Sequence, residues 1–345
     1  MIQRLLVCEF LHADRAAFSA APVSLRSEGR QMLAAVLSDA ARISDLDVAV
    51  LLCPEAAESL KQDLLACSAS PLNPHLRQPF LNSLVSAADD RDAVLLIAPE
   101  SEGCLLQLCR ELRAAGHRVL LPPTGTVAVC SDKLVCADAL SDAGLPVVTT
   151  VEPTNALLAT LPSSVVLKPR FGCGCEGIRR CQREELDGWL NAAIGASSEF
   201  VAQPYCEGDW FSIAFIGCGS QAAPLILPLA EQYIRWTKTG PLYCGGRVPA
   251  CVPSIMHEQA RSIATAVASV IPPVDGYLGI DLFLATGSGA LQIMEVNPRL
   301  CTSYTGYRKL TDDNLLSRIL QRHRDTAMAW KPTAVEFTTS AAVVD

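Results

Sequence analysis

The chain has 345 residues, of which 50% are hydrophobic and 19% are charged, and its formal net charge is -8. This length allows two or three domains with a large buried core, and the apolar share excludes an intrinsically disordered chain. A net negative charge repels the phosphate backbone of nucleic acids, so we expect no nucleic-acid partner.

The hydropathy pattern does not indicate a membrane protein. No segment offers the roughly 20 consecutive apolar residues that a membrane-spanning helix needs, so we expect no membrane partner and a cytoplasmic location. The 15 cysteines are scattered from Cys8 to Cys301 without a Cys-x-x-Cys pair. This spacing favours reduced thiols over a zinc site, although the pairs Cys173/Cys175 and Cys130/Cys136 stay open as weak metal candidates.

The first third of the chain alternates between expected strands and helices. Strands are expected at residues 4–8, 47–53, 93–97 and 118–121. Helices are expected from Ser24 or Ser27, with Glu28 as a start signal, to about Ile43 and from Glu102 to Ala115. Such alternation is typical of an open parallel sheet of Rossmann-like form. No Gly-x-Gly-x-x-Gly follows the first strand, so dinucleotide binding is not expected there.

Two lysines and a glycine-rich segment come next. Asp132 is a suitable cap for a helix that begins at Lys133, and Lys168 lies near the end of a strand over residues 165–169. The following segment contains Gly172, Gly174 and Gly177. Glycines let a backbone approach a ligand and aim N–H groups at phosphate oxygens, while a lysine adds a point charge. An exposed helix lysine and a plain turn are the alternatives.

The stretch from residue 199 to 253 mixes strands with polar turns. Glu207 and Asp209 precede a strand and, on the residues alone, fit a solvated turn. Tyr243, beside Gly245 and Gly246, either shapes a substrate pocket or belongs to an ordinary loop. An amphipathic helix is expected over residues 254–270.

Residues 276 to 308 carry the strongest functional pattern in the chain. Two alternating runs end at Ala285 and Asn297 and are separated by a turn over residues 286–290, which predicts an antiparallel hairpin. Because strand side chains repeat every second residue, Glu295 and Asn297 project from one face, and Asp281 joins them from the neighbouring strand. Hard oxygen ligands of this kind suit Mg²⁺. The alternative is a solvated hairpin face with ordinary charges.

Asp281 followed by Glu295-x-Asn297 resembles the metal-binding signature of the ATP-grasp superfamily, whose members mostly join a carboxylate to an amine through an acyl phosphate. The continuation from Asn297 to Arg308 is similar to the branch that includes tyramine-glutamate ligase of methanofuran-type cofactor synthesis. Biotin-dependent carboxylases have Gln-Val-Glu-His where this chain has residues 300–303, so bicarbonate chemistry is not expected. The resemblance covers roughly residues 120 to 325.

The resemblance implies an α/β ATP-grasp fold with three parts. These are a Rossmann-like leading domain at 1–122, a small lid subdomain at 123–202 and a large subdomain with the metal hairpin at 203–345. It also implies ATP and Mg²⁺ as cofactors, with Asp281, Glu295 and Asn297 as metal ligands. The implied nucleotide-binding residues are Lys133, Lys168, Gly172, Gly174, Gly177, Gln203, Tyr205 and Glu207. Gln203 departs from the glutamate that is common in the family at that position.

The function implied is an ATP-dependent ligase that forms an amide through an acyl phosphate, with glutamate joined to tyramine or a related amine. Lys168 and Arg299 are the expected catalytic residues, and Arg299 is suited to hold the transferring phosphoryl group. Arg299, Arg308, Tyr304 and Tyr307 are expected to offer charge and aromatic surface to the substrates. The alternatives are a ligase for another amino acid or peptide, and a nucleotide-binding regulatory protein without turnover. The expected partners are small molecules, and a homodimer is left open.

Overall fold

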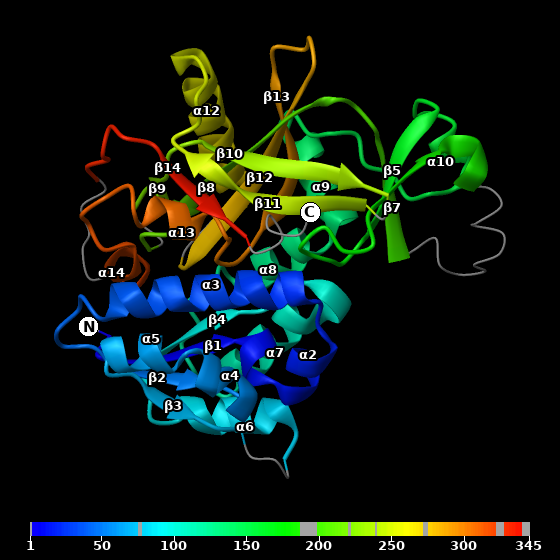
Figure 1. The fold of residues 1–345 in the computed structure, drawn as a ribbon. Coiled ribbons are helices and arrows are strands. Elements are labelled where there is room, and N and C mark those ends of the chain that lie inside the picture. The colour runs from blue at the N-terminus through cyan, green and yellow to red at the C-terminus, as the bar shows by residue number, and fades with distance from the viewer. Residues whose placement is uncertain are drawn as a thin grey trace.

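The computed structural model describes residues 2–74, 78–186, 199–219, 222–238, 240–271, 275–321 and 328–339. These residues form three β-sheets with flanking helices, as shown in Figure 1. One sheet is parallel and lies in the N-terminal part, and the other two are antiparallel. The expected α/β architecture with a Rossmann-like leading part is confirmed.

The leading sheet has four parallel strands in the order β3-β2-β1-β4. Its strands are β1 (Arg4–Glu9), β2 (Asp47–Leu51), β3 (Ser70–Leu72) and β4 (Ala93–Ile97). The helices of this part are α1 (Phe10–Ala13), α2 (Arg15–Ala20), α3 (Val23–Ala40), α4 (Pro54–Ser59), α5 (Lys61–Ala66), α6 (Phe80–Ala88) and α7 (Cys104–Ala114), with a short 3-10 helix η1 (Ser101–Gly103).

Alternate residues of these strands face opposite helical layers, as the twofold period of a strand requires. Leu5 belongs to the core that contains Leu33 of α3, whereas Leu6 belongs to the core that contains Leu108 of α7. Helix α3 lies between the leading sheet and the rest of the molecule (Figure 1), and its core continues to Tyr304. This helix is therefore covered on two sides, and its side chains reach into the interior.

Several local expectations for the leading part are wrong. The expected strand at 118–121 is only a single bridge between Val119 and Val94, and β3 forms in a Pro-containing stretch where no strand is expected. Helix α3 begins after Pro22 without a side-chain cap. Glu28 is therefore not a capping residue, because tertiary contacts instead of a local hydrogen bond decide its position.

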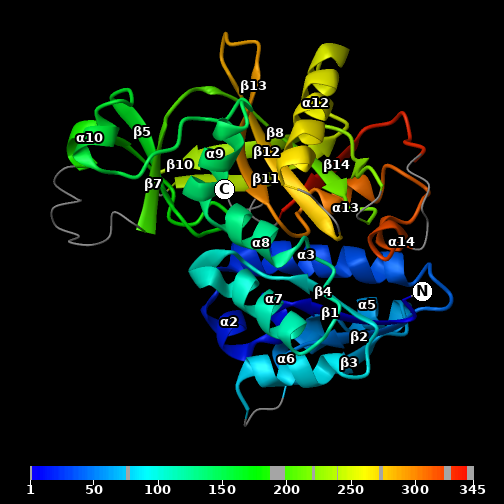
Figure 2. The ribbon, with the colours of Figure 1, turned by 180° about the vertical axis from the view of Figure 1, so that it is seen from behind.

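The lid sheet is antiparallel, with the order β6-β5-β7. Its strands are β5 (Ser164–Pro169), β6 (Arg179–Gln182) and β7 (Phe200–Pro204). The helices before it are α8 (Thr124–Ser131), α9 (Lys133–Asp142) and α10 (Asn155–Leu158). Since β7 continues to Pro204, the predicted boundary at residue 202 falls inside a strand. From behind, α8 and α9 run along the junction between the leading part and the large sheet (Figure 2).

The large sheet has seven antiparallel strands in the order β13-β12-β8-β10-β11-β14, with β9 paired to β8. Its strands are β8 (Gly208–Ile216), β9 (Leu225–Ile226), β10 (Ala230–Thr237), β11 (Gly240–Val248), β12 (Tyr277–Ala285), β13 (Leu291–Asn297) and β14 (Val335–Thr338). Its helices are α12 (Ser254–Val270), α13 (Tyr304–Tyr307) and α14 (Leu315–Ile319). Helix α14 is short, and all five of its residues are buried.

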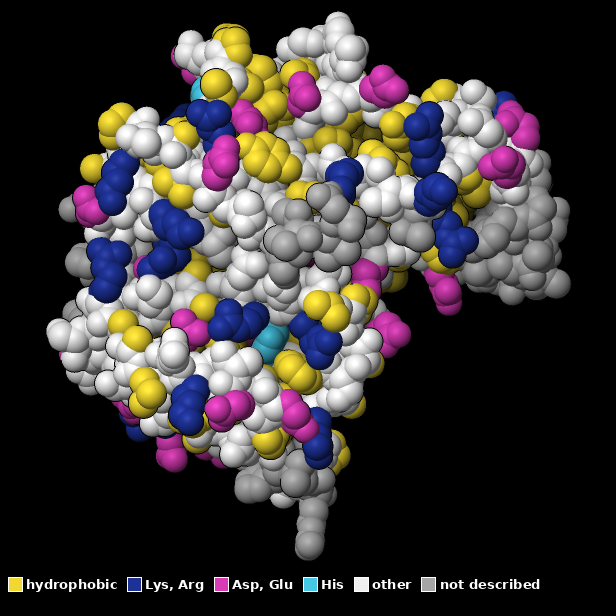
Figure 3. Space-filling view, viewed as in Figure 1, with side chains coloured by type: hydrophobic (Ala, Val, Ile, Leu, Met, Phe, Trp, Pro, Cys, Tyr) yellow, Lys and Arg dark blue, Asp and Glu magenta, His cyan; other side chains and the backbone are white. Residues whose placement is uncertain are grey.

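Charged side chains of both signs are interspersed on the face shown in Figure 3 and form no continuous band there. Across the described residues, every helix is too short or too polar to cross a membrane.

Candidate functional site

A cavity of about 230 Å³ lies where the lid sheet, the large sheet and helix α3 meet. Most of the predicted site residues line it: Lys133, Lys168, Gly172, Gly174, Gln203, Tyr205, Asp281, Glu295, Asn297 and Arg299. Gly177 and Glu207 are not among the lining residues, and Glu207 is exposed on the turn between β7 and β8. The fold thus brings residues separated by more than a hundred positions into one site.

The hairpin of β12 and β13 places three oxygen-bearing side chains together. Asp281 stands directly opposite Glu295, and Gly279 stands opposite Asn297. Asn297 Nδ2 donates to Asp281 Oδ2 at 3.0 Å, and Gln232 Nε2 donates to Asp281 Oδ1 at 2.8 Å. The register shift after Asp281 keeps the two carboxylates on the same face of the sheet.

The two carboxylates and two lysines form a charged cluster that consists of Lys133, Lys168, Asp281 and Glu295. Burial, together with the charge of Glu295, raises the pKa of Asp281 to about 7. Burial would also raise the pKa of Glu295, but Lys133 and Lys168 outweigh it and lower that pKa. Desolvation lowers the pKa of Lys168, although Glu295 opposes the shift. Glu295 lies beside Lys133, whereas Asp281 accepts hydrogen bonds from neutral amides, so a divalent cation between the two facing carboxylates would stabilise them.

The glycine loop between β5 and β6 is held at its start and over its length. Asp132 caps α9 and also accepts two hydrogen bonds at 2.8 Å from Arg170. Lys133 Nζ donates to the carbonyl oxygen of Gly172 at 2.6 Å and lies 3.9 Å from Glu295 Oε2. A Cβ at Gly174, where φ is +63°, would come within 2.1 Å of Leu25 of α3. The loop therefore packs against the leading part, and glycine permits that approach.

The hinge at the end of β7 forms the other end of the cavity. Gln203 is buried and donates from Nε2 to Thr150 Oγ1 at 2.9 Å, while its Oε1 has no hydrogen-bond partner among the described residues. Tyr205 packs edge-to-face with Trp236, with the ring centroids 5.6 Å apart. A buried acceptor beside aromatic rings fits a flat ligand that carries an amino group.

Arg299 lines the cavity, and its guanidinium is held in place by Glu100 of the leading part. Its Nε and Nη2 donate to the two oxygens of Glu100 at 2.9 and 3.0 Å, and its Nη1 donates to the Leu300 carbonyl at 3.2 Å. Burial would lower the pKa of Arg299, but Glu100 outweighs it and the pKa is raised. Three of the five guanidinium N–H groups are thus engaged, which leaves two for a ligand.

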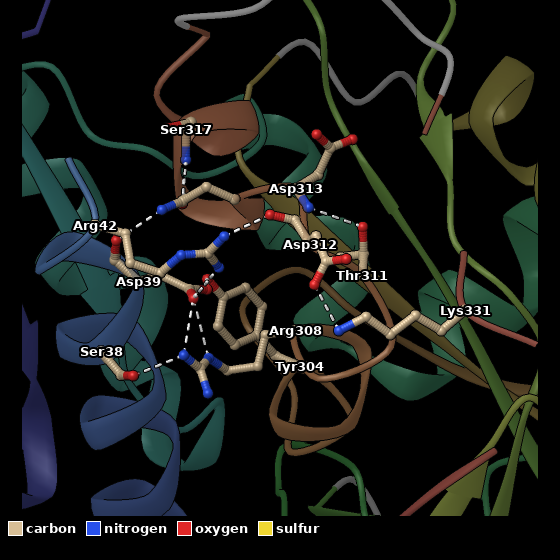
Figure 4. A network of polar contacts seen from close by, with 11 residues as sticks. Ser38, Asp39, Arg42, Tyr304, Arg308, Thr311, Asp312, Asp313, Ser317 and Lys331 are labelled. Carbon is tan, nitrogen blue, oxygen red and sulfur yellow. Dashed lines mark hydrogen bonds and ion pairs between the residues drawn. The ribbon is translucent and has the colours of Figure 1, made fainter. Parts of the chain in front are cut away.

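Tyr304, Tyr307 and Arg308 do not line the cavity. Both tyrosines are fully buried, and Tyr304 donates to Asp39 Oδ2 at 2.6 Å. The guanidinium of Arg308 faces Asp39 (Figure 4), with Nη2 at 3.0 Å from Asp39 Oδ1. The expected substrate-binding role is therefore wrong for these three residues. The chain turns into α13 after Ser303, Tyr304 and Arg308 point at Asp39 of α3, and Tyr307 donates to the Pro228 carbonyl oxygen at 2.8 Å.

Several site residues have no local motif to reveal them. Glu28 of α3, Gln232 of β10 and Tyr243 of β11 line the cavity, and of these the sequence suggested only Tyr243 as a pocket residue. Glu100 holds Arg299 from just beyond β4. These residues belong to the site because they lie at the carboxyl edge of the leading sheet or on a neighbouring strand, and the order of the strands has to be known before this can be predicted.

The cysteines give no indication of a metal centre or a cross-link. All fifteen are free, and Cys173 and Cys175 line the cavity. Within the described ranges, no group of three His, Cys, Asp or Glu side chains is placed to hold a metal. The hairpin set has two carboxylates and an amide, which is why it does not form such a group.

The ATP-grasp domain model matches residues 130–303, which is more than half of the chain. The chain belongs to the ATP-grasp superfamily. A pre ATP-grasp 3 domain model matches residues 65–127 of the leading part. This membership makes the chain an ATP-dependent ligase, with ATP and Mg²⁺ as its cofactors. The search of curated proteins found no match.

Solved ATP-grasp structures share the fold across most of the chain. A structure of an ATP-grasp superfamily protein from Archaeoglobus fulgidus is 18% identical, with a TM-score of 0.68, and covers 92% of this chain and 87% of its own. The biotin carboxylase domain of a Hydrogenobacter thermophilus 2-oxoglutarate carboxylase, solved with MgADP, is 17% identical with a TM-score of 0.72, and covers 95% of this chain and 71% of its own. N5-carboxyaminoimidazole ribonucleotide synthetase from Thermotoga maritima is 16% identical with a TM-score of 0.63, and covers 92% and 76%. At such identities the likeness establishes the fold.

The residues of this chain fit the two cofactors. Asp281, Glu295 and the side-chain amide oxygen of Asn297 could supply hard oxygen ligands of the kind that Mg²⁺ prefers. Lys133, Lys168 and the glycine loop surround the space beside them, where phosphate oxygens would find positive charge and N–H donors. The orphaned Gln203 Oε1 and the Tyr205 and Trp236 rings suit the base.

Proposed function

We propose that this chain activates an amino-acid carboxylate as an acyl phosphate and then joins it to an amine. The observation that carries this proposal is the placement of the charged cluster, Arg299 and Glu28 in one cavity. The charged cluster serves phosphoryl transfer, and Arg299 and Glu28 offer charge of both signs beyond it. The carboxylate of an amino acid would match the positive charge of Arg299, and the ammonium group of an amine would match the negative charge of Glu28.

Each residue has a part that follows from its contacts. ATP supplies the phosphoryl group that makes the carboxylate reactive, and Mg²⁺ neutralises charge as that group moves. Lys168 is 4% exposed and lies beside Glu295 and Lys133, so it acts as a fixed point charge for phosphate oxygens. Arg299, oriented by Glu100, points its two remaining N–H groups at the carboxylate or the developing tetrahedral oxygen.

We propose glutamate as the donor and tyramine or a related aromatic amine as the acceptor, because the continuation after Asn297 is similar to the tyramine-glutamate ligase branch. Tyr304, Tyr307 and Arg308 do not support this choice, since they are turned away from the cavity. Tyr243 does support it, because this ring lines the cavity from β11. A ligase for another amino acid has the same charged groups and is separated from this choice only by substrate tests.

The test is ATP consumption with a panel of amino acids, with and without amines. We expect glutamate to stimulate ADP release, tyramine to stimulate it further, and hydroxylamine to trap the activated donor as a hydroxamate. Another amino acid that stimulates more strongly would replace glutamate in the proposal. If no amino acid yields ADP or hydroxamate with any amine, the ligase proposal fails and nucleotide binding without turnover takes its place.

A further inference from the structure

Glu28 is a carboxylate that the leading part presents to the cavity from helix α3. The helix cannot easily turn at this point, because its neighbour Gly29 packs against Glu9 at the end of β1. A Cβ at Gly29 would come within 2.7 Å of the Glu9 carboxylate. The direction of Glu28 is therefore set by the close packing of the next residue in the helix.

This carboxylate has no cation as a partner among the residues that the structure describes. Thr302 Oγ1 donates to Glu28 Oε2 at 3.2 Å, which is the hydrogen bond that the Glu28 side chain makes within those residues. Arg299 is within electrostatic range of Glu28, but the Nε and Nη2 atoms of its guanidinium donate to Glu100 at 2.9 and 3.0 Å. Burial raises the pKa of Glu28 to about 7, against the opposing effects of Thr302 and Arg299.

The surroundings of Glu28 differ from those of the charged cluster. The groups that face it are Arg299 and Thr302 after β13, Cys173 and Cys175 of the glycine loop, and Tyr243 of β11. The lysines lie in the charged cluster, which is the proposed phosphate site. Arg299 is within electrostatic range of both Glu28 and Glu295. A ligand cation beside Glu28 would thus lie next to the group that orients the reacting carbonyl.

We propose that Glu28 binds the ammonium group of the acceptor amine and accepts the proton that this amine loses before it attacks. The inference rests on the proposed ligase function and names the residue that selects a primary amine. Transfer of one proton to the Glu28 carboxylate leaves the amine with a free electron pair. That pair forms the C–N bond, the bond from the acyl carbon to the phosphate oxygen breaks, and the departing phosphate takes the second amine proton.

Glu28→Gln is the first test, because it keeps the shape and removes the charge. The first half-reaction, activation of the donor carboxylate, is measured as hydroxamate formation from donor, ATP and hydroxylamine. Hydroxylamine is largely uncharged at neutral pH, so it needs neither an ammonium site nor a base. We expect kcat/KM for the amine to fall by about 100-fold or more, with hydroxamate formation changed by less than about threefold. Glu58→Gln, at an exposed site on α4, is the matched control and should change neither.

The pH dependence of kcat/KM for the amine is a second measurement, because it would not change if Glu28 had a purely structural role. In the wild type, kcat/KM for the amine should rise with pH through about 7 as Glu28 ionises. Glu28→Gln should remove this limb. Thr302→Val removes the hydrogen bond that lowers the pKa of Glu28, so it should move the limb to higher pH. Thr302→Val also decides the case if Glu28→Gln does not fold.

The outcomes separate this inference from the proposed function. If wild-type protein forms no hydroxamate with any amino acid, the ligase proposal fails and the inference fails with it. If hydroxamate forms but Glu28→Gln keeps the wild-type kcat/KM for the amine, Glu28 is not the acceptor site. If hydroxamate formation falls as steeply as amine use, Glu28 binds the ammonium group of the donor, which also overturns the inference.

Discussion

Buried carboxylates in this molecule differ in the partner that compensates them. Glu100 and Asp39 are each paired with an arginine, Arg299 and Arg308. Asp281 accepts hydrogen bonds from neutral amides, and Glu28 accepts one from a hydroxyl. Both of these carboxylates line the cavity. Glu100 and Asp39 are thus compensated by arginine, whereas Asp281 and Glu28 are left for ligands, at a cost in stability.

At the scale of the residue, Glu28→Gln should stabilise the protein at neutral and alkaline pH. The pKa of Glu28 in the folded state is about 7, above its ordinary value of 4.5, so the folded state holds the proton more tightly. The contribution of protonated Glu28 to the stability of the folded state is full below pH 4.5 and is lost as the pH rises through 7. The stability difference between variant and wild type should therefore grow over this window, to roughly 3 kcal/mol or less.

Chemical denaturation at a series of pH values measures this difference. Glu58→Gln serves as the control, since that carboxylate is exposed and its replacement should leave the pH dependence unchanged. A variant that is less stable than wild type at pH 8 would contradict the pKa assigned to Glu28.

Glu295→Gln should abolish turnover while the protein stays folded. The variant keeps the hydrogen-bonding shape but removes a charge that faces Asp281 and balances two lysines. Loss of one carboxylate from a magnesium site should lower kcat by about 100-fold or more. The measurement is ADP release, with circular dichroism to verify the fold. Near-normal ADP release by a folded variant would refute the metal assignment.

At the scale of the element, the glycine loop over residues 171–178 joins two parts of the molecule. Its contacts are those of Arg170 with Asp132, Gly172 with Lys133 and Gly174 with Leu25. We expect its amides to exchange quickly without nucleotide and slowly with Mg-ATP, because phosphate would add partners to the backbone N–H groups. Hydrogen exchange followed by mass spectrometry measures this. Equal exchange rates at saturating nucleotide would show a static turn.

Gly174→Ala should weaken ATP binding through the contact with Leu25. The new Cβ would lie 2.1 Å from Leu25 Cδ2, so the leucine must leave its rotamer or the loop must shift. Either change costs about 1 kcal/mol, which is roughly a fivefold rise in the KM for ATP.

Gly103→Ala is the matched control for this variant. Gly103 also has a positive φ, +70°, but an added Cβ there meets nothing within 4 Å. It should therefore affect stability and leave the KM for ATP unchanged. Leu25→Ala combined with Gly174→Ala should restore ATP binding. An unrestored KM would show that the left-handed backbone, and not the contact, causes the defect.

At the scale of the whole molecule, helix α3 connects the leading sheet to the segment after the metal hairpin. The carboxylate of Asp39, in α3, accepts hydrogen bonds from Tyr304 and Arg308 (Figure 4). Its backbone carbonyl oxygen accepts from Asn314 Nδ2 at 2.7 Å. The same helix carries Glu28 at its other half. The network therefore fixes the distance between the leading part and the charged cluster.

Arg308→Met should destabilise the protein without changing the chemistry. It removes the guanidinium that lies 3.0 Å from the fully buried Asp39 carboxylate and leaves only Arg42 at 3.9 Å and the Tyr304 hydroxyl, which should cost about 3 kcal/mol. Arg15→Met, which breaks the exposed pair with Glu55, should cost less than about 1 kcal/mol. Denaturant titration measures both, and kcat at a temperature where both variants are folded should stay unchanged. A selective loss of amine use by Arg308→Met would restore a substrate role for this residue.

The sequence by itself determined the local patterns of this protein. Period-two alternation and the turn over 286–290 were enough for the hairpin, and they placed Asp281, Glu295 and Asn297 on one face, since strand geometry is local. The glycine loop beside Lys168 was likewise visible, because glycine spacing is a property of the chain. Only the tertiary structure decided the partners that come from distant elements. Glu28 resembled a helix start signal, and Tyr304 and Arg308 resembled a substrate surface, until packing placed α3 between the two sheets. Burial and pairing across hundreds of residues depend on where the chain returns, which no local pattern encodes.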